Sequence, residues 1–150
     1  MTVPEQMASL RRAVRRRLTE RLGERTSRPF MQLLALKSIA DGVRSQSAIA
    51  ERLIVDAPAV SRLVARLEED GLVKRSTAED RRCVRLELSP AGQAELNLLR
   101  DALLWMDEEL LRYLSTREME EFKRLMAKLQ TGLMQARGPV PLDSCGSSDS

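Results

Sequence analysis

The fold is decided by residues 45–92, which read SQSAIAERLIVDAPAVSRLVARLEEDGLVKRSTAEDRRCVRLELSPAG. Asp56 can cap a helix there, because its carboxylate can accept a hydrogen bond from a free backbone N–H of the first turn, and Pro58 tolerates a first-turn position. Apolar residues then recur three or four positions apart, at Val60, Leu63, Val64 and Leu67. This spacing predicts a helix from about residue 57 whose apolar stripe packs on a small core.

The outer face of this helix is slim and carries no acid before Glu68. It consists of Pro58, Ala59, Ser61, Arg62, Ala65 and Arg66. A helix with so narrow a polar face can enter the major groove of DNA, which is wide enough to admit one helix. A shorter helix is expected before it, capped by Ser45 or Ser47, with Ile49, Ala50 and Leu53 on its inner side. The pair predicts a helix-turn-helix motif, although a plain helical hairpin in an all-α core would share the pattern.

A predicted hairpin favours the helix-turn-helix interpretation. Gly71 is a natural residue to end the helix, and residues 72–76 read as a short strand. After a polar tip, Val84, Leu86 and Leu88 alternate with polar or small residues, which predicts a second strand with one apolar side that faces the core. The hairpin is then a wing with residues 77–82 at its tip, where Asp80 is expected to orient Arg82 toward a minor groove of DNA. A solvated turn whose charges serve solubility is the alternative.

Together these segments resemble the MarR family of bacterial transcription regulators. The resemblance rests on SQSAIAERL (45–53), VSRLVARLEEDGLV (60–73), DRR (80–82) and LSPAG (88–92). It implies a homodimeric winged-helix protein that binds pseudo-palindromic double-stranded DNA and is released or retuned by a small molecule or an oxidant. One residue departs from the pattern, since Ile54 stands where such proteins often have glycine in the turn. A β-branched residue resists positive φ, so this turn either takes another conformation or carries strain.

The predicted DNA-binding residues lie on three segments. Arg62 and Arg66 are the candidates for base or phosphate contact, and small residues beside them allow close approach; the set on this helix is Ala57, Pro58, Ala59, Ser61, Arg62 and Arg66. Phosphate contacts that set the register are expected from Ser45, Gln46, Ser47 and Lys74 or Arg75. The wing adds Asp80, Arg81 and Arg82. The predicted function is a sequence-specific, DNA-binding transcription regulator, most simply a repressor. The alternative is a winged-helix protein-interaction adaptor, which a steep salt dependence of DNA binding would argue against.

The two ends of the chain carry opposite charge. Residues 1–28 hold eight arginines against three glutamates, whereas residues 93–136 hold six basic and eight acidic side chains. This balance suits packing of the first helix against the last two, within or between subunits. The alternative is a phosphate-binding stripe formed by Arg11, Arg12, Arg15, Arg16 and Arg17.

Apolar seams on the terminal helices indicate a dimer. The first helix carries Met7, Leu10, Val14, Leu18 and Leu22, and the last carries Met119, Phe122, Leu125, Met126, Leu129 and Leu133. A capping box at residues 115–118 predicts the start of the last helix. More apolar surface is present than one small domain needs, which predicts a homodimer built from both ends. Packing of the terminal helices on each other within a monomer is the alternative.

The mostly α-helical fold with a small antiparallel β wing is therefore predicted to have four parts. Residues 1–28 form an N-terminal dimerisation helix, 29–92 the winged helix-turn-helix lobe, 93–136 the C-terminal dimerisation helices, and 137–150 a disordered tail. Within this frame a helix is expected from about Pro29 to Asp41, a short strand at 43–44, and a long helix from Ser89 to about Tyr113.

Catalysis, a cofactor and a metal site are not expected. The chain has no histidine, and its two cysteines, Cys83 and Cys145, fit neither a disulfide framework nor a metal-ligand spacing. No apolar run is long enough to span a bilayer and no signal-peptide core is present, so we expect a cytoplasmic protein without a membrane partner.

Two kinds of signal site are candidates. Phe30, Trp105 and Tyr113 could line a pocket for an aromatic effector, although large residues at helical spacing are commonly core. Cys83 could sense oxidants, because nearby arginines favour the reactive thiolate; an inert strand cysteine is the alternative.

Overall fold

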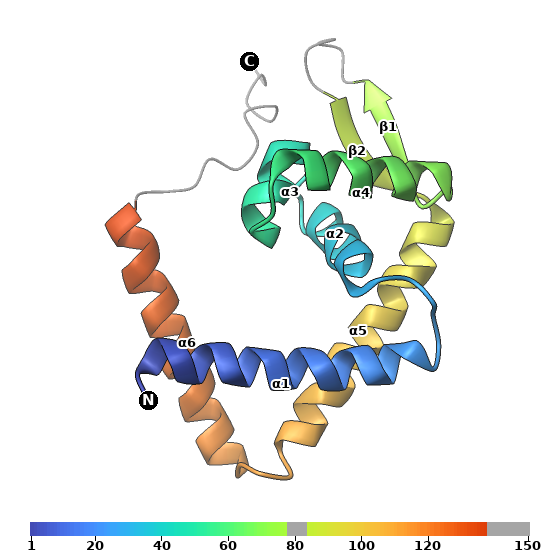
Figure 1. Ribbon diagram of the computed structural model, residues 1–150. Helices are drawn as coiled ribbons and strands as arrows, with labels where there is room; N and C mark the ends of the chain where they lie inside the picture. The colour runs from blue at the N-terminus through green and yellow to red at the C-terminus, as the bar shows by residue number, and fades with distance from the viewer. Residues whose placement is uncertain (78–83, 138–150) are drawn as a thin grey trace. The chain divides into compact units, whose positions relative to one another are not determined.

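The computed structural model describes residues 1–77 and 84–137 (Figure 1). The elements are α1 (Val3–Gly23), α2 (Phe30–Ala40), α3 (Gln46–Leu53), α4 (Ala57–Glu69), β1 (Val73–Thr77), β2 (Val84–Leu88), α5 (Pro90–Leu110) and α6 (Thr116–Arg137). The predicted fold class, mostly α with a small antiparallel wing, is confirmed. The chain divides into two compact units. We call Thr19–Arg100 the recognition unit, and Met1–Leu18 with the described residues from Asp101 onward the terminal unit.

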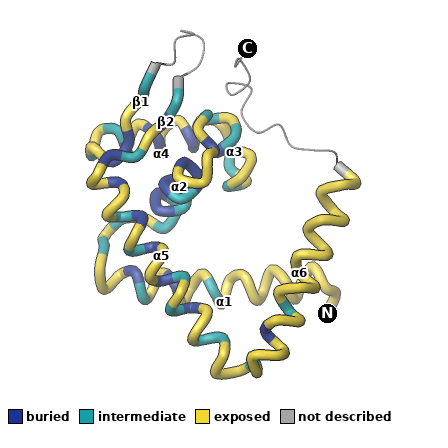
Figure 2. The backbone as a smooth tube through the Cα atoms, turned by 180° about the vertical axis from the view of Figure 1, so that it is seen from behind, coloured by how far each residue is buried: buried dark blue, intermediate teal, exposed yellow. Residues whose placement is uncertain are grey.

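The recognition unit has one apolar core. The largest fully buried side chains are Leu33 and Leu36 of α2, Ile49 of α3, Val60, Val64 and Leu67 of α4, Leu86 of β2, and Leu96 and Leu99 of α5. Figure 2 shows this burial as dark stretches on the inner sides of these helices. The predicted apolar stripe of α4 is confirmed, with Leu63 half-buried beside it.

The turn between α3 and α4 is held by side-chain caps and one strained residue. Ser45, rather than Ser47, caps α3 by accepting a hydrogen bond from the Ala48 N–H (3.2 Å). Asp56 caps α4 by accepting from the Ala59 N–H (2.7 Å). Between them Ile54 adopts the left-handed conformation, with φ 57° and ψ 51°, and its side chain is 82% exposed. Of the two outcomes the sequence allowed, the turn has the strained one, because an L side chain with a branched Cβ is disfavoured there.

The wing begins where α4 ends. Gly71, at φ 73°, lets the Leu72 N–H reach back to the Leu67 carbonyl oxygen (2.9 Å), which closes the helix. Strands β1 and β2 then pair antiparallel from Val73 opposite Leu88 to Thr77 opposite Val84.

The short strand expected at residues 43–44 is not part of the described sheet, which has two strands. The Val43 N–H is already used to close α2, since it donates to the Ser38 carbonyl oxygen (2.9 Å). The segment still meets the sheet, since the Leu86 N–H donates to the Arg44 carbonyl oxygen (3.3 Å).

The first turn of α5 is attached to the end of α4. The Ser89 hydroxyl accepts from the Gly92 N–H (3.1 Å) and donates to the Gly71 carbonyl oxygen (2.5 Å), and the Ser89 N–H donates to the Leu72 carbonyl oxygen (3.0 Å). A Cβ at Gly92 would lie 2.1 Å from that Leu72 oxygen. Only glycine permits this approach. Helix α5 ends at Leu110, three residues before the predicted end at Tyr113, which lies in a turn.

The terminal unit contains most of α1, the second half of α5, and α6. The Arg17 guanidinium lies over the Trp105 ring, 5.4 Å from its centroid, and forms an ion pair with Glu109 (3.0 Å). The predicted capping box of α6 is confirmed: the Ser115 N–H donates to Glu118 (2.9 Å) and the Glu118 N–H donates to the Ser115 hydroxyl (3.1 Å). Among the described helices, none combines the length and apolar character needed to cross a membrane.

Candidate nucleic-acid interface

The outer face of α4 is exposed and almost free of acids. Ala57, Pro58, Ser61, Arg62, Ala65 and Arg66 are all exposed, and Ala59 is half-buried. On the opposite side of the same helix, Val60, Val64 and Leu67 are fully buried in the core. Because the buried stripe anchors the helix, the outer face is presented in one orientation. The small side chains keep it narrow, and the arginines give it positive charge.

The start of α3 is tied to this face. The Ser61 hydroxyl of α4 donates to the Gln46 side-chain oxygen (3.0 Å), so Gln46 and Ser61 lie together although they are far apart in the chain. Ser45 uses its hydroxyl as the α3 cap, and Ser47 is exposed beside it, with the two hydroxyl oxygens 3.4 Å apart. The structure therefore brings this group of predicted phosphate contacts next to α4.

The two arginines of the outer face differ in their surroundings. Arg62 forms no ion pair with any residue that the structure describes, whereas Arg66 is paired with Asp70 (3.2 Å, Nε to Oδ2) one turn along the helix. Asp70 also accepts a hydrogen bond from Arg28 (2.8 Å). The Arg28 hydrogen bond, with the charges of both arginines, holds the pKa of Asp70 below its usual value and keeps it ionised. Arg62 is consequently the more available cation of the pair.

Arg28 extends this pairing to α5, through a network that sequence reasoning missed. Its guanidinium also donates to Gln32 (3.3 Å) and lies 3.8 Å from Glu95, which in turn accepts from the Thr26 hydroxyl (2.9 Å). The spacing of Arg66 and Asp70, four residues apart, could have indicated their pairing. Nothing in the sequence indicated Arg28, which lies 42 residues before Asp70.

On the wing, Arg75 is paired with Glu68 of α4, so its charge is partly compensated. Lys74 is exposed and makes no ion pair within the described part of the chain. Asp80, Arg81, Arg82 and Cys83 lie outside the described residues, as does the predicted tail with Cys145. The predictions for the wing tip and for the cysteine therefore rest on the sequence.

The residues predicted to line an effector pocket are divided between the units. Phe30 is half-buried at the start of α2 in the recognition unit, whereas Trp105 and Tyr113 belong to the terminal unit. Tyr113 is 78% exposed, and Trp105 lies against Arg17. Their role in a pocket stays a prediction. In the ranges 1–77 and 84–137 no group of three potential metal ligands comes together.

The chain is similar to one protein-family model and to several solved structures. The family model described as the MarR family matches residues 26–82. The crystal structure of wild-type MarR (apo form) from E. coli is 23% identical with a TM-score of 0.74, covering 86% of this chain and 97% of that chain. The transcriptional regulator BldR from Sulfolobus solfataricus is 26% identical with a TM-score of 0.71, covering 86% and 92%. S. aureus MepR bound to ethidium bromide is 23% identical with a TM-score of 0.55, covering 89% and 97%.

Proposed function

We propose, from the premise that the chain belongs to the MarR family of winged-helix transcription regulators, that it represses transcription by binding a pseudo-palindromic operator as a homodimer. Helix α4 of each subunit enters a major groove, and the residues at the start of α3 hold the flanking phosphates. The wing residues Asp80, Arg81 and Arg82 reach the adjacent minor groove.

The observation that carries this proposal is the outer face of α4. It combines small side chains that are exposed except for the half-buried Ala59 with a cation, Arg62, that has no ion-pair partner among the described residues, on a helix whose other side is buried. A helix must be both narrow and firmly anchored to approach base edges closely. The Gln46–Ser61 hydrogen bond adds the start of α3 to the same surface.

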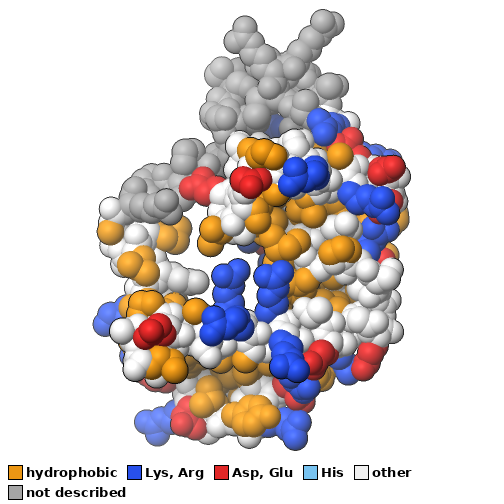
Figure 3. Space-filling view, in the orientation of Figure 1, with side chains coloured by type: hydrophobic (Ala, Val, Ile, Leu, Met, Phe, Trp, Pro, Cys, Tyr) orange, Lys and Arg blue, Asp and Glu red, His pale blue; other side chains and the backbone are white. Residues whose placement is uncertain are grey.

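The homodimer is supported by apolar side chains left exposed on the terminal unit. Figure 3 shows such side chains along α6. On α1, Met7 and Leu10 are 53% and 46% exposed, and on α6 Leu129 and Leu133 are 51% and 69% exposed. Exposed apolar faces of this kind mark association surfaces. Changing Leu129 and Leu133 together to glutamate should convert a dimer to a monomer, as measured by light scattering after size exclusion; a wild-type monomer would remove the dimer from the proposal.

The DNA-binding test is selection from a pool of random duplex DNA at near-physiological salt, followed by anisotropy titrations with the enriched sequence. An inverted repeat with half-sites about one helical turn apart is expected. Arg62→Ala should weaken binding by about 1–3 kcal/mol. Arg117→Ala, which removes an exposed arginine of α6, is the matched control and should leave the affinity unchanged.

A protein-interaction adaptor is the second candidate. Its winged helix would retain DNA only weakly, with no enriched sequence, and Arg62→Ala and Arg117→Ala would then behave alike. A regulator instead shows a steep fall in affinity with salt, because each phosphate contact releases counterions.

We also propose that a small molecule or an oxidant modulates the binding. Cys83, in the wing sequence, is the candidate for the oxidant. This role of Cys83 is tested by measuring the operator affinity of the wild type and of Cys83→Ser with and without hydrogen peroxide. The peroxide should change the affinity of the wild type and leave that of Cys83→Ser unchanged.

A further inference from the structure

The chain passes between the terminal unit and the recognition unit along α1 and along α5, since each of these helices belongs in part to both units. A linker, residues 24–29, follows α1 and leads into α2. Its start is closed by the N–H groups of Arg25 and Thr26, which both donate to the Leu22 carbonyl oxygen (2.9 Å). Within the linker only Thr26 and Arg28 are not exposed. The linker is therefore attached to the recognition unit mainly through these two side chains.

Arg28 attaches the linker to the end of α4. Its guanidinium donates to Asp70 (2.8 Å), the residue that caps the C-terminus of α4, and Asp70 also accepts from the Arg66 Nε (3.2 Å). The side chains of Arg28 and Asp70 are each only 23% exposed. A hydrogen bond between charged groups is stronger than a neutral one, and water screens this one only in part. The last turn of α4 is thus held to the linker by a strong polar contact.

The same side chain reaches α2 and α5. The Arg28 Nε lies 3.8 Å from Glu95 of α5, and Glu95 accepts from the Thr26 hydroxyl (2.9 Å). That hydroxyl accepts in turn from the Arg28 N–H (3.2 Å). The Arg28 guanidinium also donates to Gln32 near the start of α2 (3.3 Å). One residue can join so many elements because a guanidinium carries five donors in a planar fork.

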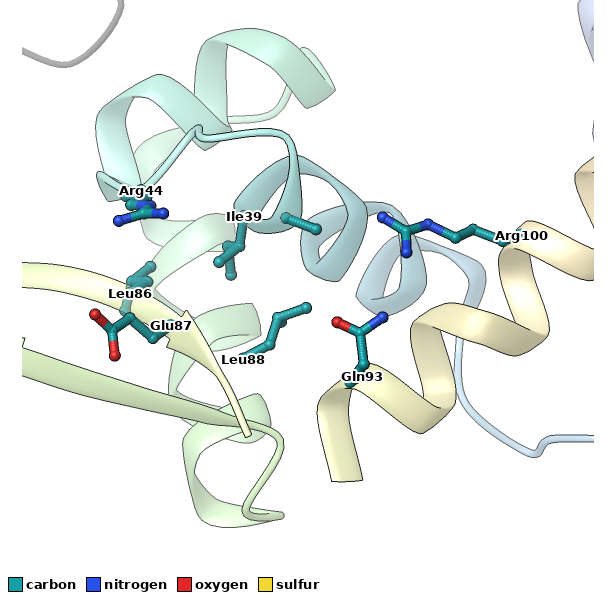
Figure 4. A pocket seen from close by; sticks show the side chains of 8 residues that line it. Ile39, Arg44, Leu86, Glu87, Leu88, Gln93 and Arg100 are labelled. Atoms are coloured by element: carbon teal, nitrogen blue, oxygen red, sulfur yellow. The ribbon is translucent and has the colours of Figure 1, made fainter. Parts of the chain in front are cut away.

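The flank of α5 away from Glu95 borders a small cavity of about 270 Å³, which lies between the end of α2, strand β2 and α5 (Figure 4). Gln93 and Arg100 of α5 contribute to its lining. Since each helical residue turns by about 100°, these two residues lie on one side of the buried stripe of α5 and Glu95 lies on the other; Leu96 and Leu99 form the stripe. A void offers few packing contacts. The position of α5 therefore depends more on its other flank, where the Arg28 contacts are made.

We propose that Arg28 is a positioning residue for DNA recognition: it holds α4 in one orientation relative to the linker after α1 and to α5. This inference rests on the proposed function. In a dimer joined through the terminal helices, the position of α4 relative to its two chain connections sets the distance and the angle between the two DNA-reading helices. Arg28 does not touch the DNA and acts through Asp70 and Glu95. Its effect is to restrict the half-site spacings that the dimer accepts.

The spacing preference of the dimer tests this role. Inserting one base pair between the half-sites of the selected operator moves them apart by about 3.4 Å and rotates one relative to the other by about 35°. The wild type should bind the lengthened operator at least thirtyfold more weakly than the selected one. In Arg28→Met, which keeps the hydrocarbon stem and loses every side-chain donor, this ratio should fall to fivefold or less.

Arg25→Met is the matched control, because Arg25 lies in the same linker, is exposed and forms no ion pair with any described residue. It should keep the wild-type ratio. A loss of stability alone would weaken binding to both operators by the same factor, so it would leave the ratio unchanged. A ratio in Arg28→Met equal to that of the wild type would overturn the proposal.

Amide hydrogen exchange of the full-length protein, followed by NMR without DNA, tests the restraint itself. Arg28→Met should speed exchange at least fivefold at Thr26 in the linker and at Gly71 and Leu72, whose N–H groups close the end of α4. The amide of Leu36, inside α2, should keep its wild-type rate, and so should all four amides in Arg25→Met. Unchanged rates at Thr26, Gly71 and Leu72, or an equal increase at Leu36, would overturn the proposal.

The two measurements separate this inference from the proposed function. Faster local exchange together with a failed DNA selection would remove the regulator, and with it the DNA role of Arg28, while the restraint on α4 would stand. A specific operator whose spacing preference survives in Arg28→Met would remove only the role of Arg28. Faster local exchange together with a relaxed spacing preference supports both.

Discussion

Replacing Gly92 by alanine should destabilise the protein even though alanine favours helices. A Cβ at this position would lie 2.1 Å from the Leu72 carbonyl oxygen and 3.1 Å from its carbonyl carbon. Ordinary contacts of carbon with oxygen begin at about 3.3 Å, so the start of α5 must move by about 1 Å. Such a shift breaks the hydrogen bonds of Ser89 with Gly71 and Leu72, each worth about 1 kcal/mol.

The net effect follows from three contributions. Loss of the two hydrogen bonds costs about 2 kcal/mol, and overpacking adds about 1–3 kcal/mol. The higher helix propensity of alanine offsets about 1 kcal/mol of this loss of stability. We therefore expect the free energy of unfolding to fall by about 2–4 kcal/mol.

Urea denaturation followed by circular dichroism measures this change, at one fixed protein concentration because association would shift the midpoint. Gly132→Ala is the matched control: it also lies within a helix, but a Cβ there meets nothing within 4 Å. The control should be as stable as the wild type or up to about 1 kcal/mol more stable. If Gly92→Ala behaved like Gly132→Ala, the close approach of α5 to Leu72 would be refuted.

Three further substitutions test other features of the structure. Ile54→Gly should raise the free energy of unfolding by about 0.5–1 kcal/mol, because relief of the left-handed strain exceeds the entropy cost of glycine and the side chain is 82% exposed; a lower urea midpoint would contradict the strain. Asp70 has a folded pKa below its unfolded value, so its stabilisation is present above about pH 4 and is lost as pH falls through the folded pKa. The urea midpoint of the wild type should therefore fall as the pH is lowered from about 5 to about 3, and the midpoint of Asp70→Asn should fall less. An equally steep fall in both proteins would argue against the pairing of Asp70 with Arg28. Ser115→Ala should cost about 1 kcal/mol and increase amide exchange in the first turn of α6, since it removes half of the capping box; unchanged exchange would count against the cap.

The sequence by itself determined the local elements of this protein. Asp56, Gly71 and the capping box of α6 mark helix ends because their hydrogen bonds are made within a few residues of the chain. The buried and exposed faces of α4 followed from apolar spacing, because a helix repeats its faces every three to four residues. The wing strands could be placed by alternation, to within a residue.

The tertiary structure alone decided how those elements meet. It joined Arg28 to Asp70 and Glu95, brought Leu72 against Gly92, and formed the cavity between α2, β2 and α5. It also decided between two possibilities at Ile54, where packing of α3 and α4 imposes a left-handed turn that local preference opposes. These features join residues distant in the chain, and sequence periodicity carries information only about neighbours on one helix or strand. Which faces come together depends on the packing of the whole core.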